Sequence, residues 1–209
     1  MIYRLGFYTG KLLSNKIIQY FSVKVKILMQ AIYSGWISNQ LLKVGNNFLI
    51  NPPCFFSGLK HIEIGNNFLA RKRLRLEAIS EYNGIKYNPK IIIGNNVQIE
   101  EDCHIGCVNK IEIGDNVLIA GKVMITDHSH GDTELESLVI NPIERPLYSK
   151  GAVRIEKQVW IGEGVTIMPG VTIGNNSIIG ANAVVTKSFP EYSVIAGNPA
   201  KCVKQKEEI

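Results

Sequence analysis

Acidic residues are missing from the first 62 positions of the sequence, while that segment contains seven basic residues. The net charge of +5 therefore arises in the N-terminal part of the chain. The seven positions are Arg4, Lys11, Lys16, Lys24, Lys26, Lys43 and Lys60. Binding of single-stranded nucleic acid would call for stacking aromatics interleaved with the basic residues along the predicted strands, which this sequence lacks. We predict no nucleic-acid partner.

Long apolar runs are also missing. Residues 11–43 contain stretches of helical character, but lysines interrupt them too often for a membrane-spanning helix, which needs about 20 consecutive apolar residues. We expect residues 1–43 to form a basic, partly helical extension. One interpretation packs its apolar side against the main body of the protein. Another places it on an anionic membrane surface as a peripheral contact.

Cysteine is sparse. The four cysteines lack the spacing of a zinc ribbon or a disulfide framework, and the N-terminus does not resemble a cleavable secretory signal. The expected location is therefore the cytoplasm, at the membrane periphery under the second interpretation above. A chain of 209 residues with 45% hydrophobic residues is long enough for one domain with a sizeable core.

An aliphatic residue recurs at every sixth position over much of the chain, and a small or branched residue usually follows it four positions later. Strand side chains alternate in direction, so both positions of each hexad point the same way and form one buried row when coils stack. The first position is occupied by Ile93, Ile99, Ile105, Ile113, Ile119, Ile125, Ile155, Ile161, Ile167, Ile173, Ile179 and Val185.

A corner motif returns over a longer period, as VGNN at 44, IGNN at 64, IGNN at 93, IGDN at 113 and IGNN at 173, with IEKQ at 155 in the same phase. Gly and Asn tolerate the left-handed backbone of tight corners. The pattern predicts an all-β parallel β-helix of about six coils over residues 44–190. Two steps between corners are too long for one coil and predict protruding loops at 71–90 and 131–151. Residues 191–209 form a C-terminal tail.

The histidines of the sequence ITDHSHGDTE stand where the hexads stop, at the base of the second loop. Imidazole titrates near neutral pH, so His128 or His130 is a candidate general base. The alternative is an exposed pair bonded to Asp127 or Asp132. A zinc site would need His61 and His104 to converge with them, which the coil phases do not support, so we predict no metal.

Several segments resemble the hexapeptide-repeat acyltransferases, namely the hexads, DHSHGD, VWIGEGVTIMPGVTIGNNSIIGANAVVTK and AGNPAKCVK. Within that family the sequence is similar to the galactoside, maltose and nodulation-factor O-acetyltransferases and to bacterial surface-polysaccharide O-acetyltransferases. The resemblance covers residues 44–204. It implies a left-handed parallel β-helix, a homotrimer, and acetyl-CoA bound along the groove between subunits.

The resemblance also implies roles for individual residues. An ungapped run from IGDNVLIA places the catalytic histidine at His130, which we favour, and a two-residue shift at the corner would place it at His128. Trp160 matches an aromatic neighbour of that histidine. Glu100 stands where relatives have an Asn that touches acceptor and cofactor. The implied coenzyme A contacts are Glu163, Ala181, Thr186, Lys187, Lys201 and Lys204, and the loop residues expected near the acceptor include Arg75, Arg145 and Tyr148.

The expected function is transfer of an acetyl group from acetyl-CoA to a sugar hydroxyl, in the biosynthesis of a cell-surface polysaccharide. Two alternatives stay open. One is an N-acetyltransferase of an amino sugar or a xenobiotic acetyltransferase. The other is a trimeric β-helix scaffold without activity. Binding of coenzyme A distinguishes the enzymes from the scaffold.

Overall fold

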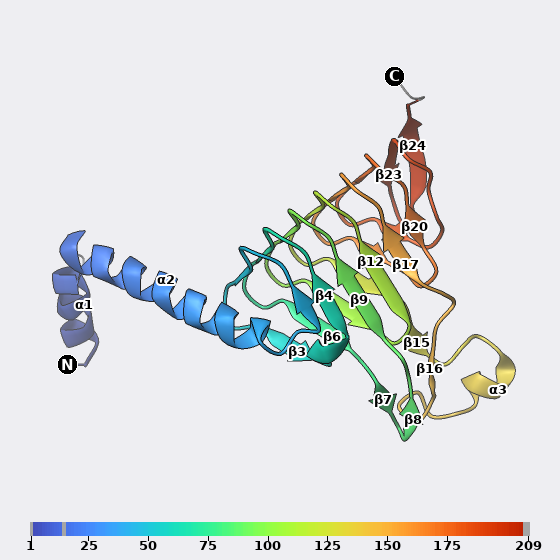
Figure 1. Ribbon diagram of the computed structural model, residues 1–209, viewed down its shortest axis with the longest axis horizontal. Coiled ribbons are helices and arrows are strands. Elements are labelled where there is room, and N and C mark those ends of the chain that lie inside the picture. Colours follow the sequence, from blue (N-terminus) through green and yellow to red (C-terminus); the bar gives the residue numbers. More distant parts are fainter. Residues whose placement is uncertain (1, 14–15, 207–209) are drawn as a thin grey trace.

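The computed structural model describes residues 2–13 and 16–206, and shows two N-terminal helices followed by a prism of stacked strands (Figure 1). Position 1 and positions 14–15 of the predicted extension, and positions 207–209 of the predicted tail, lie outside the described residues. The helices are α1 (Ile2–Leu13) and α2 (Lys16–Ser38). No helix in the described ranges is long and apolar enough to cross a membrane.

Three sheets form the sides of the prism, and within each sheet neighbouring strands come from successive coils, except that β24 pairs antiparallel with β23 at the end of the second sheet. The first sheet contains β1 (Lys43–Val44), β4 (Ile62–Ile64), β9 (Lys90–Ile93), β12 (Lys110–Ile113), β17 (Val153–Ile155) and β20 (Thr172–Ile173). The second contains β2 (Leu49–Ile50), β5 (Leu69–Ala70), β10 (Gln98–Ile99), β13 (Leu118–Ile119), β18 (Trp160–Ile161), β21 (Ile178–Ile179), β23 (Ser193–Ala196) and β24 (Lys201–Gln205). The third contains β3 (Phe55–Ser57), β6 (Arg75–Ala78), β11 (His104–Cys107), β14 (Met124–Thr126), β19 (Thr166–Ile167) and β22 (Val184–Val185), and a short 3-10 helix, Leu59–His61, follows β3.

The core confirms the hexad pattern. Strands pair in parallel one coil apart, so that Ile99 lies opposite Ala70 on one side and Ile119 on the other. All twelve aliphatic residues that begin the predicted hexads are buried. The one polar residue among the small inward positions is Ser177, which is fully buried; its Oγ accepts from the backbone N–H of Ser193 at 3.2 Å. Burial of a hydroxyl is tolerated there because it is hydrogen-bonded.

The corner motifs are confirmed in the same way. The fourth residue of every predicted corner has a positive φ, between 55° and 60°, including Gln158 of IEKQ. Asparagine suits these positions because its short polar side chain tolerates the left-handed region. Its amide also bonds along the prism: Asn67 Nδ2 donates to Asn96 Oδ1 at 2.8 Å, and Asn96 Nδ2 to Asn116 Oδ1 at 2.9 Å.

Two excursions leave the prism on the same side (Figure 1). The first is shorter than the predicted loop of residues 71–90: residues 71–78 run along the coil, and the projecting part is a hairpin of β7 (Glu81–Tyr82) and β8 (Ile85–Lys86). The second contains β15 (Ser129–His130), helix α3 (Leu135–Leu138) and β16 (Leu147–Tyr148), and includes the predicted loop of residues 131–151.

Hydrogen bonds join the two excursions. The hydroxyl of Tyr82 and the side-chain amide of Asn83 both donate to the carbonyl of Ile143, at 2.8 and 2.7 Å. The backbone N–H of Leu147 donates to the hydroxyl of Tyr87 at 2.8 Å. The hairpin therefore supports the longer loop, and the two excursions form walls of the space beside the third sheet.

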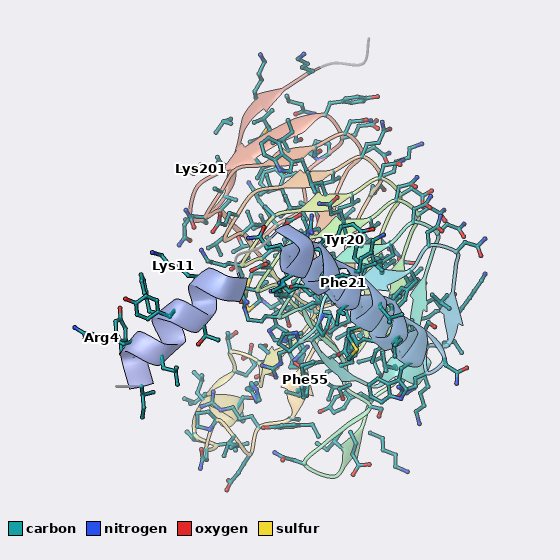
Figure 2. The ribbon with its side chains drawn as sticks, turned by 90° about the vertical axis from the view of Figure 1, so that its left-hand side faces the viewer. Arg4, Lys11, Tyr20, Phe21, Phe55 and Lys201 are labelled. Carbon is teal, nitrogen blue, oxygen red and sulfur yellow. The ribbon has the colours of Figure 1, made fainter. Side chains whose placement is uncertain are left out.

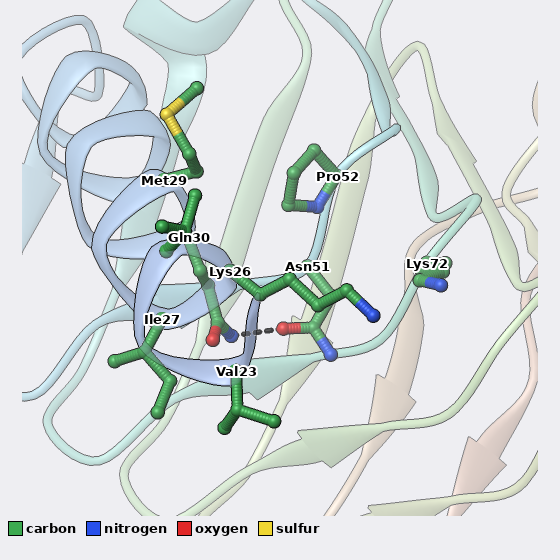
Figure 3. Close-up of a pocket in the computed structure, with 9 residues that line it drawn as sticks. Val23, Lys26, Ile27, Met29, Gln30, Asn51, Pro52 and Lys72 are labelled. Atoms are coloured by element: carbon green, nitrogen blue, oxygen red, sulfur yellow. Dashed lines mark hydrogen bonds between the residues drawn. The ribbon is translucent and has the colours of Figure 1, made fainter. Parts of the chain in front are cut away.

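Helix α2 packs on the first coil through its C-terminal part. Ile37 is buried, and the backbone N–H of Ile50 donates to Ser34 Oγ at 3.0 Å. One turn earlier, the Gln30 amide donates to Asn51, and a groove of about 420 Å³ opens between the helix and the coil (Figure 3). The interpretation that packs the extension on the main body thus holds for the end of α2, whereas its earlier turns project away (Figure 1).

Candidate active site

A cavity of about 480 Å³ lies where the two excursions meet the third sheet. Its walls come from strands β3, β6 and β11, from the hairpin and from the base of the longer loop. Three of the four histidines of the sequence line it. The lining residues are Ser57, Arg75, Glu77, Ile79, Tyr82, His104, His128, His130 and Leu147.

A buried aspartate holds the first of these histidines. Nδ1 of His128 lies 3.1 Å from Oδ1 of Asp127, and the imidazole is only 13% exposed. A carboxylate accepts hydrogen bonds, so Nδ1 carries the proton in this pair. In the neutral form of the ring, Nε2 of His128 is then the nitrogen without a proton, and this is the form in which an imidazole can act as a general base.

Asp127 is fixed by the coil below it. Its two oxygens accept from the backbone N–H groups of Val108 and Asn109 at 2.9 and 2.8 Å, and the Cys107 thiol donates to Oδ2 at 3.2 Å. Burial raises the pKa of Asp127, but the hydrogen bonds from His128 and from the two backbone groups outweigh it and hold the pKa below its usual value. The fully buried carboxylate is therefore ionised and accepts every one of these bonds.

A second histidine–carboxylate pair faces the first. Nε2 of His104 lies 2.9 Å from Oε2 of Glu77, which also forms an ion pair with Arg75. Burial lowers the pKa of His104 and outweighs the opposing effect of the bond to Glu77, so this imidazole is neutral near neutral pH. The cavity thus presents two imidazole rings, each paired with a carboxylate, and the ring of His104 is uncharged near neutral pH.

Gly106 separates the two rings. A Cβ built there would lie 3.3 Å from both His104 Nε2 and His128 Cε1. Gly106 pairs with Glu77 on one side and Thr126 on the other, in the row of the third sheet that points outward. The missing side chain therefore leaves room between the imidazoles for part of a substrate.

Gly106→Ala is expected to lower kcat/KM for the acceptor about tenfold, because contacts at 3.3 Å force the imidazoles to shift by a few tenths of an ångström. Steady-state kinetics with varied acceptor measure this. Gly35→Ala is the control, since a Cβ at Gly35 meets no atom within 4 Å. Equal effects of the two substitutions would contradict a role for Gly106 in the cavity.

The predicted loop residues differ in their positions. His130 is exposed at the rim and packs edge-to-face on Tyr82, with ring centroids 5.3 Å apart. Arg75 lies in the cavity wall. The Arg145 side chain instead forms hydrogen bonds within the longer loop, where it donates to the carbonyls of Ile140 and Leu138 at 2.9 and 3.0 Å. Tyr148 is exposed on β16 and does not line the cavity.

Two further predicted residues lie on another side of the prism. Trp160 is half-exposed on β18 of the second sheet, between Leu118 and Ile178 of the adjacent coils. Glu100 follows β10 in the same sheet and lies 3.7 Å from Arg71. The histidine cavity is on the third sheet, so a single chain does not bring Trp160 or Glu100 into it.

The implied coenzyme A contacts begin at the edge between the second and third sheets. Glu163 and Ala181 lie there on neighbouring coils, where the N–H of Asn182 donates to the carbonyl of Glu163 at 2.8 Å. The Glu163 carboxylate is neutralised by Lys122, whose Nζ is 2.6 Å away. The charge of Glu163 at this position is therefore balanced within the chain.

The remaining implied contacts are at the C-terminal end of the prism. Thr186 and Lys187 follow β22, and Nζ of Lys187 lies 5.7 Å from the centre of the Phe189 ring. Lys201 and Lys204 are exposed on β24, which runs antiparallel to β23 (Figure 2 labels Lys201). These lysines supply cationic groups of the kind that phosphates bind. In the described part of the chain, no cluster of three or more potential ligands has the geometry to hold a metal ion.

Sequence reasoning did not assign roles in the site to Asp127, His104 or Gly106, and it expected Glu77 only as part of the lining of the acceptor pocket. For Asp127 a signal exists: it follows Ile125 by two residues, so strand alternation directs it inward, where an ionisable residue must be hydrogen-bonded. Glu77 and His104 have no such signal, because they become part of the site through the excursions that cover the outer face of the sheet.

The relatives of this chain identify its family. A family model described as bacterial transferase hexapeptide (six repeats) matches residues 152–187. WbbJ of Escherichia coli K12, a predicted lipopolysaccharide biosynthesis O-acetyl transferase, is 42% identical over 161 residues, which make up 75% of this chain and 78% of WbbJ. The chain belongs to the hexapeptide-repeat acyltransferases.

Solved structures resemble this hexapeptide-repeat acyltransferase along most of its length. A galactoside acetyltransferase in complex with coenzyme A is 31% identical, with a TM-score of 0.52 over 82% of this chain and 68% of its own. A maltose O-acetyltransferase from Clostridium difficile 630 is 27% identical, with a TM-score of 0.58 over 94% of this chain and 91% of its own. The predicted family and the predicted left-handed parallel β-helix are confirmed, and the protein is an enzyme.

Proposed function

We propose that this acyltransferase moves the acetyl group of acetyl-CoA to a sugar hydroxyl, during the biosynthesis of a cell-surface polysaccharide. The observation that carries the proposal is the Asp127–His128 pair in the cavity, in which the buried carboxylate of Asp127 holds Nδ1 of the imidazole. The name of WbbJ supports a polysaccharide precursor as the acceptor. The cytoplasm is the proposed location, in keeping with four cysteines that are all free thiols.

The chemistry follows from the positions of the side chains. Acetyl-CoA supplies an activated acetyl thioester. Nε2 of His128 accepts the proton of the acceptor hydroxyl as its oxygen bonds to the acetyl carbon, and Asp127 stabilises the imidazolium that results. His104, held neutral against Glu77, positions the acceptor from the opposite wall of the cavity. The proton on His128 then passes to the leaving thiolate.

We include a homotrimer in the proposal. Trp160 and Glu100 lie on the second sheet and the histidine cavity on the third, so the predicted roles of both residues require a neighbouring subunit to bring its second sheet against the cavity. The groove between subunits would then continue along Glu163 and Ala181 to the lysines of the C-terminal end. Binding of coenzyme A there agrees with the complex of the similar galactoside acetyltransferase.

Thiol release from acetyl-CoA, measured with a panel of sugars, amino sugars and polysaccharide fragments, tests the function. We expect release that depends on a hydroxyl acceptor, and stabilisation of the fold by about 2.7 kcal/mol when coenzyme A is present at 100 times its Kd. A faster reaction with an amino sugar, acetylated on nitrogen, would favour the N-acetyltransferase alternative. No release and no stabilisation would favour the scaffold.

A further inference from the structure

The N-terminal helices expose an apolar face that the rest of the chain does not cover. Ile18, Phe21, Val25, Leu28, Ile32 and Trp36 follow one another at intervals of three or four residues and therefore share one side of α2. Their exposed fractions range from 40% to 62%. We call these six residues the docking face. Continuous apolar surface of this length is typical of an interaction site.

The side of α2 that contacts the prism is a different one. Gln30, Ser34 and Ile37 make the contacts with the first coil, and helical geometry places them roughly opposite the docking face. Figure 2 looks onto α2 from outside, with Tyr20 and Phe21 labelled on it. The β-helix therefore holds α2 with its docking face turned away from the body of the protein.

The basic residues of α1 and α2 indicate what kind of partner the docking face binds. Lys24 is exposed beside the docking face, Lys26 is exposed at the groove between α2 and the first coil (Figure 3), and α1 adds Arg4 and Lys11, which lie to one side of the β-helix in Figure 2. No acidic residue occurs in the first 62 positions of the sequence. In the described part of the chain, neither Lys24 nor Lys26 forms an ion pair; Lys24 lies over the ring of Tyr20 instead.

We propose that α1 and α2 dock on the surface of a bilayer rich in anionic phospholipid, with the docking face among the upper acyl chains and the lysines at the headgroup phosphates. Lysine side chains reach upward from a partly immersed helix in this way, and Trp and Tyr prefer the same depth. A second copy of α2 fits the face less well, because it would bring lysines against lysines without a compensating carboxylate.

Flotation of the full-length protein with vesicles tests the proposal. We expect binding to vesicles that mix phosphatidylglycerol with phosphatidylcholine, much weaker binding to pure phosphatidylcholine, and a decrease with added salt. The double variant Phe21→Glu with Leu28→Glu should bind about a hundredfold more weakly, since it removes two large apolar groups from the face. Leu135→Glu with Val139→Glu is the control, because both residues are exposed apolar residues of the long loop.

Charge reversal gives a second test that does not alter the apolar face. Lys24→Glu with Lys26→Glu should weaken binding to the anionic vesicles about tenfold or more. Lys60→Glu with Lys157→Glu makes the same change of net charge at exposed positions of the β-helix and should leave binding unchanged.

Equal binding of the wild type to both kinds of vesicle, or wild-type binding by the Phe21→Glu, Leu28→Glu variant, would overturn the proposal. Sedimentation velocity tests whether a second copy of the chain, and not a bilayer, covers the docking face. If that variant dissociates into folded monomers while the wild type binds no vesicles, a second copy of the chain covers the docking face.

Discussion

Replacing His128 by alanine is expected to lower kcat about 10²–10⁴-fold, the usual contribution of a general base, with little change in the Kd for coenzyme A. The reason is geometric. Asp127 holds the proton on Nδ1, so Nε2 of His128 is the nitrogen free to accept a proton inside the cavity. Acceptor-dependent thiol release gives kcat, and calorimetric titration gives the Kd.

His130→Ala is the matched control, because His130 belongs to the same loop sequence but is exposed at the rim of the cavity, against Tyr82. It should lower kcat by less than about tenfold. A folded His128→Ala enzyme that no longer binds coenzyme A would show that His128 has been given the wrong role.

Asp127→Asn is expected to have the largest combined effect on activity and stability. The amide can accept through only one of its two ends, so either the N–H of Val108 or that of Asn109 would face an NH₂ group instead of an oxygen. A buried donor without an acceptor costs about 1–3 kcal/mol, and the kcat should fall at least about 10²-fold as His128 loses its orientation. Urea unfolding and thiol release measure the two effects.

The pH dependence of stability provides an independent check on Asp127. Its pKa is depressed in the folded state, so the carboxylate contributes stability above its unfolded pKa of about 3.9, and this contribution is lost as the pH falls through the folded pKa. The difference in unfolding free energy between wild type and Asp127→Asn should therefore shrink at acid pH. Asp132→Asn, in the same loop, should show no comparable difference at neutral pH.

The fold was predictable because its regularity is local. A six-residue period fixes which side chains point inward, and the corner residues fix where the chain turns, so Ile99 or Asn96 can be placed without knowledge of distant contacts. The left-handedness of the β-helix could not be predicted from the repeat. The handedness was predicted from the resemblance to a family, because the alternation of inward and outward side chains along a strand is the same in a left-handed and a right-handed β-helix.

The site was less predictable because it depends on contacts between distant segments. The bonds from Tyr82 and Asn83 to Ile143 join the two excursions that form walls of the cavity, across about sixty positions of sequence, and no local sequence pattern predicts them. The excursions cover the part of the third sheet where Glu77 of β6 lies beside His104 of β11. The resemblance to the family favoured His130 as the base. The structure instead favours His128, because His128 is paired with the buried carboxylate of Asp127 whereas His130 is exposed at the rim of the cavity.

The most direct test of the account compares acceptor-dependent thiol release by three folded variants, His104→Ala, His128→Ala and His130→Ala, at saturating acetyl-CoA and acceptor. We predict that His128→Ala loses most of its kcat, that His104→Ala mainly raises the KM for the acceptor, and that His130→Ala stays close to wild type. Loss of kcat in His130→Ala with activity retained in His128→Ala would contradict the assignment of Asp127–His128 as the catalytic pair.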